Sequence, residues 1–124
     1  FDFEERSALF GETVLRFLKR VPRNPENDRL IGQLAGASTS IGANYCEATE
    51  SVSPKDFRNL IGQGREEAKE WIYFLRMSAA SEPKLAEDAR SQYREARELL
   101  LILAAMARNS DINSPATSKP ISSR

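Results

Sequence analysis

Apolar residues recur along this chain at alternating steps of three and four positions, in four separate segments. The first stripe runs through Phe3, Phe10, Val14, Phe17 and Val21, with Ser7 in the same row. The second comprises Leu30, Leu34, Ala37, Ile41, Asn44 and Ala48, the third Phe57, Ile61, Gly64, Ala68, Trp71 and Leu75, and the fourth Ala89, Tyr93, Ala96, Leu100, Leu103 and Ala107. This spacing is typical of helices that bury one face against neighbours at a shallow crossing angle. No segment alternates with period two, so no strand is predicted.

Helix starts are marked by a capping residue followed by proline, at Asn24-Pro25 and Ser53-Pro54. A third start lies at Glu82-Pro83, where Ser81 is an equally good cap. We therefore predict helices over about residues 3–21, 25–50, 54–79 and 83–108. Short connections make consecutive helices antiparallel neighbours, so the fold predicted is an all-α, up-and-down antiparallel four-helix bundle.

One domain accounts for the chain of 124 residues. The bundle is predicted to occupy residues 1–109. Residues 110–124 are rich in Ser and Pro and have little apolar surface to bury, so we predict a disordered C-terminal tail there.

Charge and cysteine content narrow the class of protein. Lys plus Arg and Asp plus Glu each number 18, and this zero net charge argues against a strong generic nucleic-acid binder. A single cysteine, Cys46, excludes an internal disulfide, and no apolar run is long enough to cross a bilayer. We therefore expect a cytoplasmic protein without a membrane partner.

The second helix carries an unusual number of small residues. Gly32 and Gly36 each cost about 1 kcal/mol relative to alanine inside a helix, so close approach of another backbone is expected to offset them. Together with Ser40 and Ala43 they form a smooth face. Two explanations stay open, which are close packing within the bundle and contact between copies of the chain.

Carboxylates are the only plausible catalytic groups, because the chain has no histidine. Glu47 and Glu50 form one E-x-x-E pair and Glu67 and Glu70 another, and two such pairs could hold Mg²⁺ as in all-α nucleotide pyrophosphohydrolases. Solvated or ion-paired helix faces explain such pairs equally well. We predict no catalytic residue, no metal and no cofactor, with the Mg²⁺-dependent hydrolase as an alternative.

A basic cluster lies at the end of the first helix and comprises Arg16, Lys19, Arg20 and Arg23. Cations at this position complement the helix dipole. They could also contact phosphate or an acidic partner, so a nucleic-acid-binding accessory protein is a second alternative.

Three motifs resemble a known family. Residues 40–48 are similar to its S-I-x-A-N-x-x-E-A signature, residues 53–57 to its S-x-x-D-F helix start, and residues 67–75 to its E-A-x-E-x-x-Y-W-L segment, with Phe74 in place of the tryptophan. The family is the bacterial four-helix bundle, or 23S rRNA intervening-sequence, protein family, which includes the accessory protein of diversity-generating retroelements. The resemblance covers roughly residues 10–108.

The resemblance implies an up-and-down four-helix bundle and does not imply an enzyme, because no catalytic activity is established for the family. Members of the family commonly form ring-shaped homopentamers, so the resemblance also implies a homo-oligomer. It further implies that Asn44, Glu47 and Glu70 are structural partners between the second and third helices. The retroelement accessory proteins are strongly basic and engage nucleic acid and a reverse transcriptase, whereas this chain is neutral. From residues and resemblance together we predict a non-enzymatic homo-oligomer that serves as an adaptor or scaffold for a protein or nucleoprotein partner.

Overall fold

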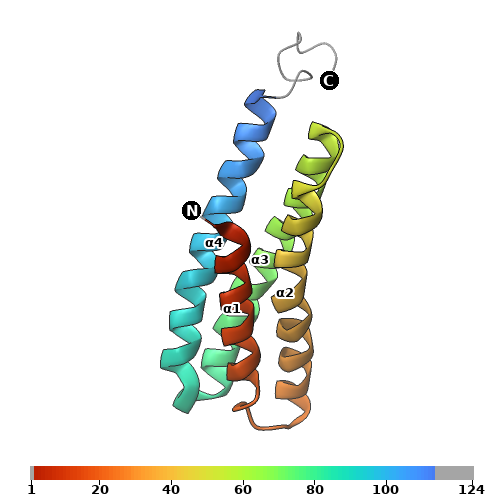
Figure 1. The fold of residues 1–124 in the computed structure, drawn as a ribbon. Helices are drawn as coiled ribbons and strands as arrows, with labels where there is room; N and C mark the ends of the chain where they lie inside the picture. The colour runs from red at the N-terminus through yellow and green to blue at the C-terminus, as the bar shows by residue number, and fades with distance from the viewer. Residues whose placement is uncertain (1, 114–124) are drawn as a thin grey trace.

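The protein is an all-α four-helix bundle. The structure, a computed structural model, describes residues 2–113, with the side chains of residues 2–109. It contains the helices α1 (Phe3–Leu18), α2 (Pro25–Thr49), α3 (Pro54–Ser81) and α4 (Ala86–Asn113), and a 3₁₀ turn, η1 (Pro83–Leu85), precedes α4 (Figure 1). Within the described range there is no strand, and consecutive helices run in opposite directions. The predicted fold class is confirmed.

Two of the predicted helix starts have the expected cap geometry. The Asn24 side chain accepts a hydrogen bond from the backbone N–H of Asn27 at 2.7 Å, and the Ser53 hydroxyl accepts one from Asp56 at 3.1 Å. In both cases proline follows in the first helical turn, where the N–H that it lacks would have no partner within the helix. These local signals fix where α2 and α3 begin.

The bounds of three helices differ from the predicted ranges by more than one residue. Helix α1 ends at Leu18 rather than near residue 21, because Pro22 disfavours helical backbone at the residue before it. Helix α3 continues to Ser81, and η1 occupies the first turn predicted for the fourth helix. Helix α4 continues to Asn113, so the first residues of the predicted tail are helical, and residues 114–124 lie outside the described residues.

The core is built from the predicted stripes. Trp71 of α3 is fully buried, and the ring of Phe10 from α1 meets it edge-on with the ring centroids 4.3 Å apart. The other large, fully buried side chains come from all four helices and include Phe3, Val14, Phe17, Leu34, Ile41, Ile61, Leu75, Leu99 and Leu103. One continuous apolar core therefore joins the helices.

Helix α1 does not lie equally close to its two neighbours. It packs far more extensively against α2 than against α4. At the α1–α2 crossing, a Cβ atom on Gly11 would lie 2.6 Å from the carbonyl oxygen of Ser38, and one on Gly42 would lie 3.4 Å from the Ser7 hydroxyl. Small residues thus let these two backbones approach closely, and the side of α1 that faces α4 is left more open.

Candidate functional site

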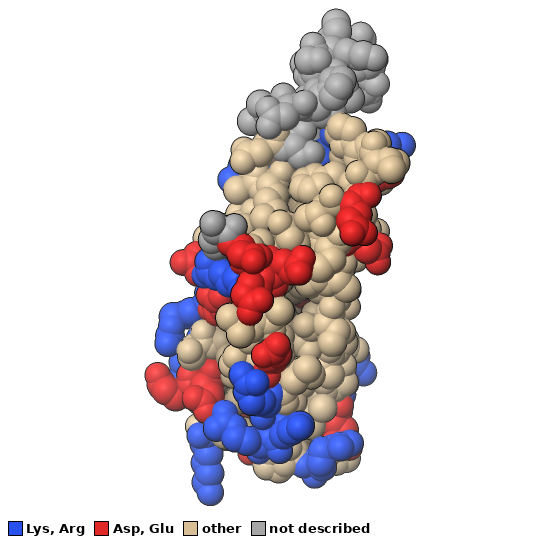
Figure 2. Space-filling model, in the orientation of Figure 1, with Lys and Arg blue, Asp and Glu red and all other residues tan. Residues whose placement is uncertain are grey.

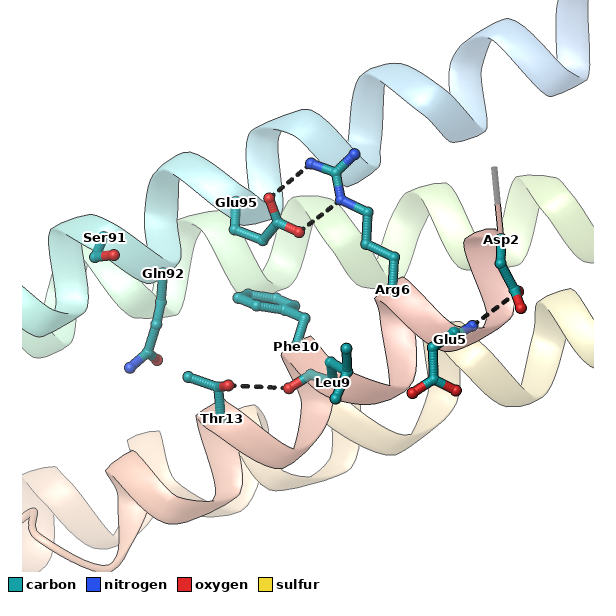
Figure 3. Close-up of a pocket in the computed structure, with 9 residues that line it drawn as sticks. All are labelled: Asp2, Glu5, Arg6, Leu9, Phe10, Thr13, Ser91, Gln92 and Glu95. Atoms are coloured by element: carbon teal, nitrogen blue, oxygen red, sulfur yellow. Dashed lines mark hydrogen bonds and ion pairs between the residues drawn. The ribbon is translucent and has the colours of Figure 1, made fainter.

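The open side of α1 forms a groove against α4. Its first part is a hollow of about 480 Å³. The lining residues are Asp2, Glu5, Arg6, Leu9, Phe10, Thr13, Ser91, Gln92 and Glu95 (Figure 3). Phe10 points from α1 toward α4, while Leu9 leaves 52% of its surface exposed. The hollow therefore combines apolar surface with charged groups on its rim.

An ion pair bridges this hollow between the two helices. Arg6 of α1 donates two hydrogen bonds to Glu95 of α4, from Nε and Nη2, each at 2.8 Å (Figure 3). The hydrogen bond to Glu95 raises the pKa of the Arg6 guanidinium, so the guanidinium stays charged at all ordinary pH values. Such bidentate geometry fixes the relative position of the two side chains, and here it holds the helices at a defined spacing.

A second hollow continues along the same seam. It has a volume of about 310 Å³ and shares Thr13, Ser91 and Gln92 with the first. Its remaining lining residues are Arg16, Phe17, Arg20 and Asp88. We refer to the two hollows together as the α1–α4 groove.

The groove is acidic at one end and basic at the other. Asp2 and Glu5 line it at the start of α1, and Arg16 and Arg20 line it at the end of α1. Figure 2 shows Lys and Arg gathered around the end of the bundle where α1 passes into α2, and Asp and Glu gathered around the start of α1. The net charge of zero therefore comes from acidic and basic residues that lie at different positions along the bundle.

The predicted basic cluster is divided between two surfaces. Arg16 and Arg20 line the α1–α4 groove, whereas Lys19 and Arg23 line a different hollow between α1 and α2. Arg20 forms an ion pair with Asp88, and Arg23 forms one with Asp28. The four cations therefore line two different hollows at the same end of the bundle, and two of the four are paired with aspartates.

The small-residue face of α2 points away from the rest of the chain. A Cβ atom added at Gly32 or Gly36 would meet nothing within 4 Å. Ala43 is exposed, and the half-buried Ser40 donates a hydrogen bond from its hydroxyl to the carbonyl oxygen of Gly36 at 2.8 Å. Close packing within the bundle therefore does not explain Gly32 and Gly36.

The polar positions implied by the resemblance lie apart from the groove. Asn44 is half-buried, and Glu47 and Glu70 are exposed. No hydrogen bond or ion pair joins these three side chains in the described structure. Their role as partners between α2 and α3 stays a prediction.

The two carboxylate pairs do not converge on a metal site. Glu47 and Glu50 line a hollow at the α2–α3 connection together with Asp56, and Glu67 and Glu70 lie further along α3. Among the residues described, no group of three His, Cys, Asp or Glu side chains is placed to hold a metal ion.

Burial raises the pKa of the nearby Cys46 thiol, and a hydrogen bond to Glu4 raises it further. A raised pKa disfavours the nucleophilic thiolate.

Glu67 gives the folded protein a pH dependence. Desolvation on α3 raises the pKa of its carboxyl above the ordinary 4.5, and the charge of Glu70 raises it further. The folded protein thus binds the proton on the Glu67 carboxyl more tightly than the unfolded chain does, so stability falls as the pH rises from about 4.5 through the folded pKa.

We expect Glu67→Gln to raise the melting temperature at pH 7 and to leave it unchanged at pH 4 or below. Thermal melts at both pH values test this, with the exposed Glu12→Gln as a control for net charge, and an equal shift at both pH values would contradict it.

Two residues that matter for the geometry were missed by the sequence analysis. Gly11 allows the close approach of α1 and α2, although a single glycine in a helical segment does not by itself predict such an approach.

Asn27 is completely buried and donates hydrogen bonds to the Pro22 carbonyl oxygen at 2.8 Å and to Glu82 at 3.0 Å. It also accepts one from Ser81. Because Ser81 and Glu82 are more than fifty positions away along the chain, only the fold brings these groups together.

A comparison with known protein families gives a match over most of the chain. A family model described as 23S rRNA-intervening sequence protein matches residues 2–105. No curated protein and no solved structure matches the chain. Separately, none of the helices in the described part of the chain is long and apolar enough to cross a membrane.

Proposed function

Because the chain belongs to the 23S rRNA-intervening sequence protein family, we propose that it is a cytoplasmic, non-enzymatic bundle that associates with copies of itself and serves as an adaptor for a protein or nucleoprotein partner. The observation that carries the proposal is the open face of α2 around Gly32 and Gly36. Each of these glycines costs about 1 kcal/mol in a helix interior, and among the described residues none lies close enough to Gly32 or Gly36 to offset that cost.

Approach of a second backbone would offset it. A helix face without Cβ atoms lets another helix come unusually close, and Ala43 and Ser40 extend this smooth surface along α2. The resemblance to ring-forming relatives adds the expectation that five copies assemble. Self-association of this kind gives a partner several identical surfaces to bind at once.

The two alternatives receive less support. A Mg²⁺-dependent hydrolase needs convergent carboxylates, and none are found in the part of the chain that the structure describes. Nucleic-acid binding needs a free basic surface, yet Arg20 and Arg23 are each engaged by an aspartate. A protein surface, or the protein component of a nucleoprotein, is therefore the better partner for this chain.

Light scattering on the purified protein tests the proposal. We expect a mass that is a multiple of 13.9 kDa at micromolar concentration. Gly36→Leu should reduce this mass by blocking close approach at α2. Gly62→Leu on α3 is the matched control, because a Cβ there also meets nothing within 4 Å. A wild-type monomer, or a mass unaffected by Gly36→Leu, would count against self-association through α2.

A further inference from the structure

One face of α4 carries a row of arginines with an exposed leucine among them. Its members recur at steps of three and four positions and so share one face of the helix, and in order they are Arg90, Arg94, Arg97, Leu101, Ala104 and Arg108. The Leu101 side chain is 58% exposed. Neither Arg94 nor Arg97 forms an ion pair with a described residue, and the Arg97 guanidinium lies over the Tyr93 ring, 6.0 Å from its centroid. We call this row the α4 ridge.

The α4 ridge belongs to the side of the bundle between α3 and α4. Arg90 and Arg94 line a hollow of about 390 Å³ there, together with Arg76 of α3. Helix α3 packs against both α2 and α4 and lies on the far side of the bundle from α1 (Figure 1). The side between α2 and α3 is therefore the next one around the bundle, and we call it the α2–α3 side.

The α2–α3 side is acidic. The open face of α2 continues at steps of three and four positions, and in order it comprises Gly32, Gly36, Ser40, Ala43, Glu47 and Glu50. Asp56 of α3 lines a hollow with Glu47 and Glu50, and Glu70 lies fourteen positions further along the same face of α3. These four carboxylates are exposed, and none of them forms an ion pair with a described residue. Small residues and unpaired negative charge thus lie together on this side.

The ridge and the α2–α3 side carry their opposite charges at matching heights along the bundle. A Cβ atom at Gly64 would lie 3.7 Å from Leu103, so these two residues mark one height on the antiparallel helices α3 and α4. Six positions beyond Gly64 is Glu70, and six positions before Leu103 is Arg97, so they share a second height. By the same count Arg108 lies within about 5 Å of the height of Asp56, at a rise of about 1.5 Å per residue.

From this complementarity we propose that the α4 ridge of one copy of the chain packs on the α2–α3 side of the next copy. Arg97 then faces Glu70, Arg108 lies near Asp56, and Leu101 lies between these charge contacts, where the small residues of α2 leave room. The inference rests on the proposed function, because it takes the chain to associate with itself, and it names the surface that meets the open face of α2.

A contact between two different surfaces generates a ring when the rotation closes. Because the charges match in height, a rotation about an axis parallel to the bundle joins the two surfaces without a shift along that axis. Neighbouring sides of a four-helix bundle meet at about 90°, and a closed ring of five copies needs about 108° between its contact sides. The contact does not require an even number of copies.

A second copy is the occupant that the observations favour. Phosphate groups would also attract the arginines of the ridge, but the exposed Leu101 at their centre has surface to bury only against another protein surface. The chain itself supplies a side with the opposite charge at the required heights. Exposed ion pairs add little affinity, so Leu101 supplies most of it, while the charges exclude other arrangements by repulsion.

The first test replaces the apolar centre of the ridge. We expect Leu101→Asp to lower the mass measured by light scattering at micromolar concentration to that of one chain, 13.9 kDa, because every copy loses its ridge. Leu9→Asp is the control, since Leu9 is also an exposed leucine, 52% exposed, but lies on α1 and on neither contact surface. An unchanged mass for Leu101→Asp, or the same loss for both variants, would overturn the proposal.

The second test exchanges two exposed charges, whose replacement does not disturb the core. Arg97→Glu should raise the concentration at which half of the chains are assembled by about tenfold, because it places a carboxylate opposite Glu70. Adding Glu70→Arg to the same chain should restore assembly. Arg16→Glu, an equal change of charge on α1, should leave assembly unchanged. A double variant that assembles no better than Arg97→Glu would overturn this pairing.

Mixing two defective variants tests whether the two surfaces meet each other. Leu101→Asp keeps its α2–α3 side, and Gly36→Leu keeps its ridge. An equimolar mixture should therefore form a pair with twice the mass of one chain and nothing larger. A mixture that contains only single chains would overturn the contact, and so would Leu101→Asp chains that associate with themselves.

The remaining outcomes separate this contact from the proposed function. A mass lowered by Gly36→Leu but not by Leu101→Asp would leave self-association through α2 in place and overturn the ridge as its partner. A mass lowered by Leu101→Asp but not by Gly36→Leu would show that the ridge meets another surface. Nucleic acid that binds the assembled wild type and is lost with Arg97→Glu would show a free ridge, which also overturns the contact.

Discussion

Replacing Trp71 with alanine is expected to lower the free energy of unfolding by about 3–5 kcal/mol, as is usual for loss of a large aromatic side chain from a core. Trp71 has no exposed surface and meets Phe10 edge-on. Removing it would leave a cavity in the core, where the side chain of Trp71 meets that of Phe10, and a well-packed helical core closes such cavities only in part. Urea denaturation followed by circular dichroism measures the loss, because the chain has no other tryptophan for fluorescence.

Trp71→Phe is the control for this substitution. The Trp71 Nε1 atom is buried without a hydrogen-bond partner among the described residues, so its removal gives up no hydrogen bond. The phenylalanine variant should therefore lose much less stability than the alanine variant. Equal losses for the two variants would contradict this, because they would show that stability depends on the part of the indole that phenylalanine lacks and not on the presence of a large aromatic ring.

Replacing Gly11 with alanine is expected to lower the free energy of unfolding by about 1–3 kcal/mol, the usual cost of overpacking. The added Cβ would lie 2.6 Å from the Ser38 carbonyl oxygen, a backbone atom that can move only if α1 and α2 separate. This loss should outweigh the gain of about 1 kcal/mol that alanine gives over glycine in an exposed helix interior.

Gly62→Ala is the matched comparison for Gly11→Ala. A Cβ atom at Gly62 would meet nothing within 4 Å, so the helix propensity of alanine should raise stability there by up to about 1 kcal/mol. The two glycine-to-alanine changes should therefore have opposite signs in the same urea titration. A stabilised Gly11→Ala variant would mean that α1 and α2 cross less closely than described.

The local parts of the fold were predictable because the signals that specify them are local. Asn24-Pro25 and Ser53-Pro54 combine a cap and a proline within a few positions, and α2 and α3 begin at these prolines in the structure. The end of α1 was placed too late, since Val21 continues the apolar stripe and is indeed buried after the helix has stopped. Burial and helical backbone are separate properties, and the stripe reports only burial.

The candidate site was less predictable, because its parts come from helices that are distant in sequence. The analysis grouped Arg16, Lys19, Arg20 and Arg23 by their spacing on one helix. The structure divides them between two hollows. Arg16 and Arg20 lie on the side of α1 that faces α4, and Lys19 and Arg23 lie on the side that faces α2. The pairing of Arg6 with Glu95 joins residues 89 positions apart, which no local pattern indicates.

By itself the sequence determined the class of fold, the number of helices, most of the core and the family, because periodicity, caps and motifs act over one or a few helical turns. Only the tertiary structure decided which glycines are packed and which are open, with Gly11 against Ser38 and Gly36 facing outward. It also decided that α1 leaves a groove along α4 with acids at one end and arginines at the other. These features depend on how closely two helices approach and how each is rotated, and both are set by packing over the whole bundle rather than by any single segment.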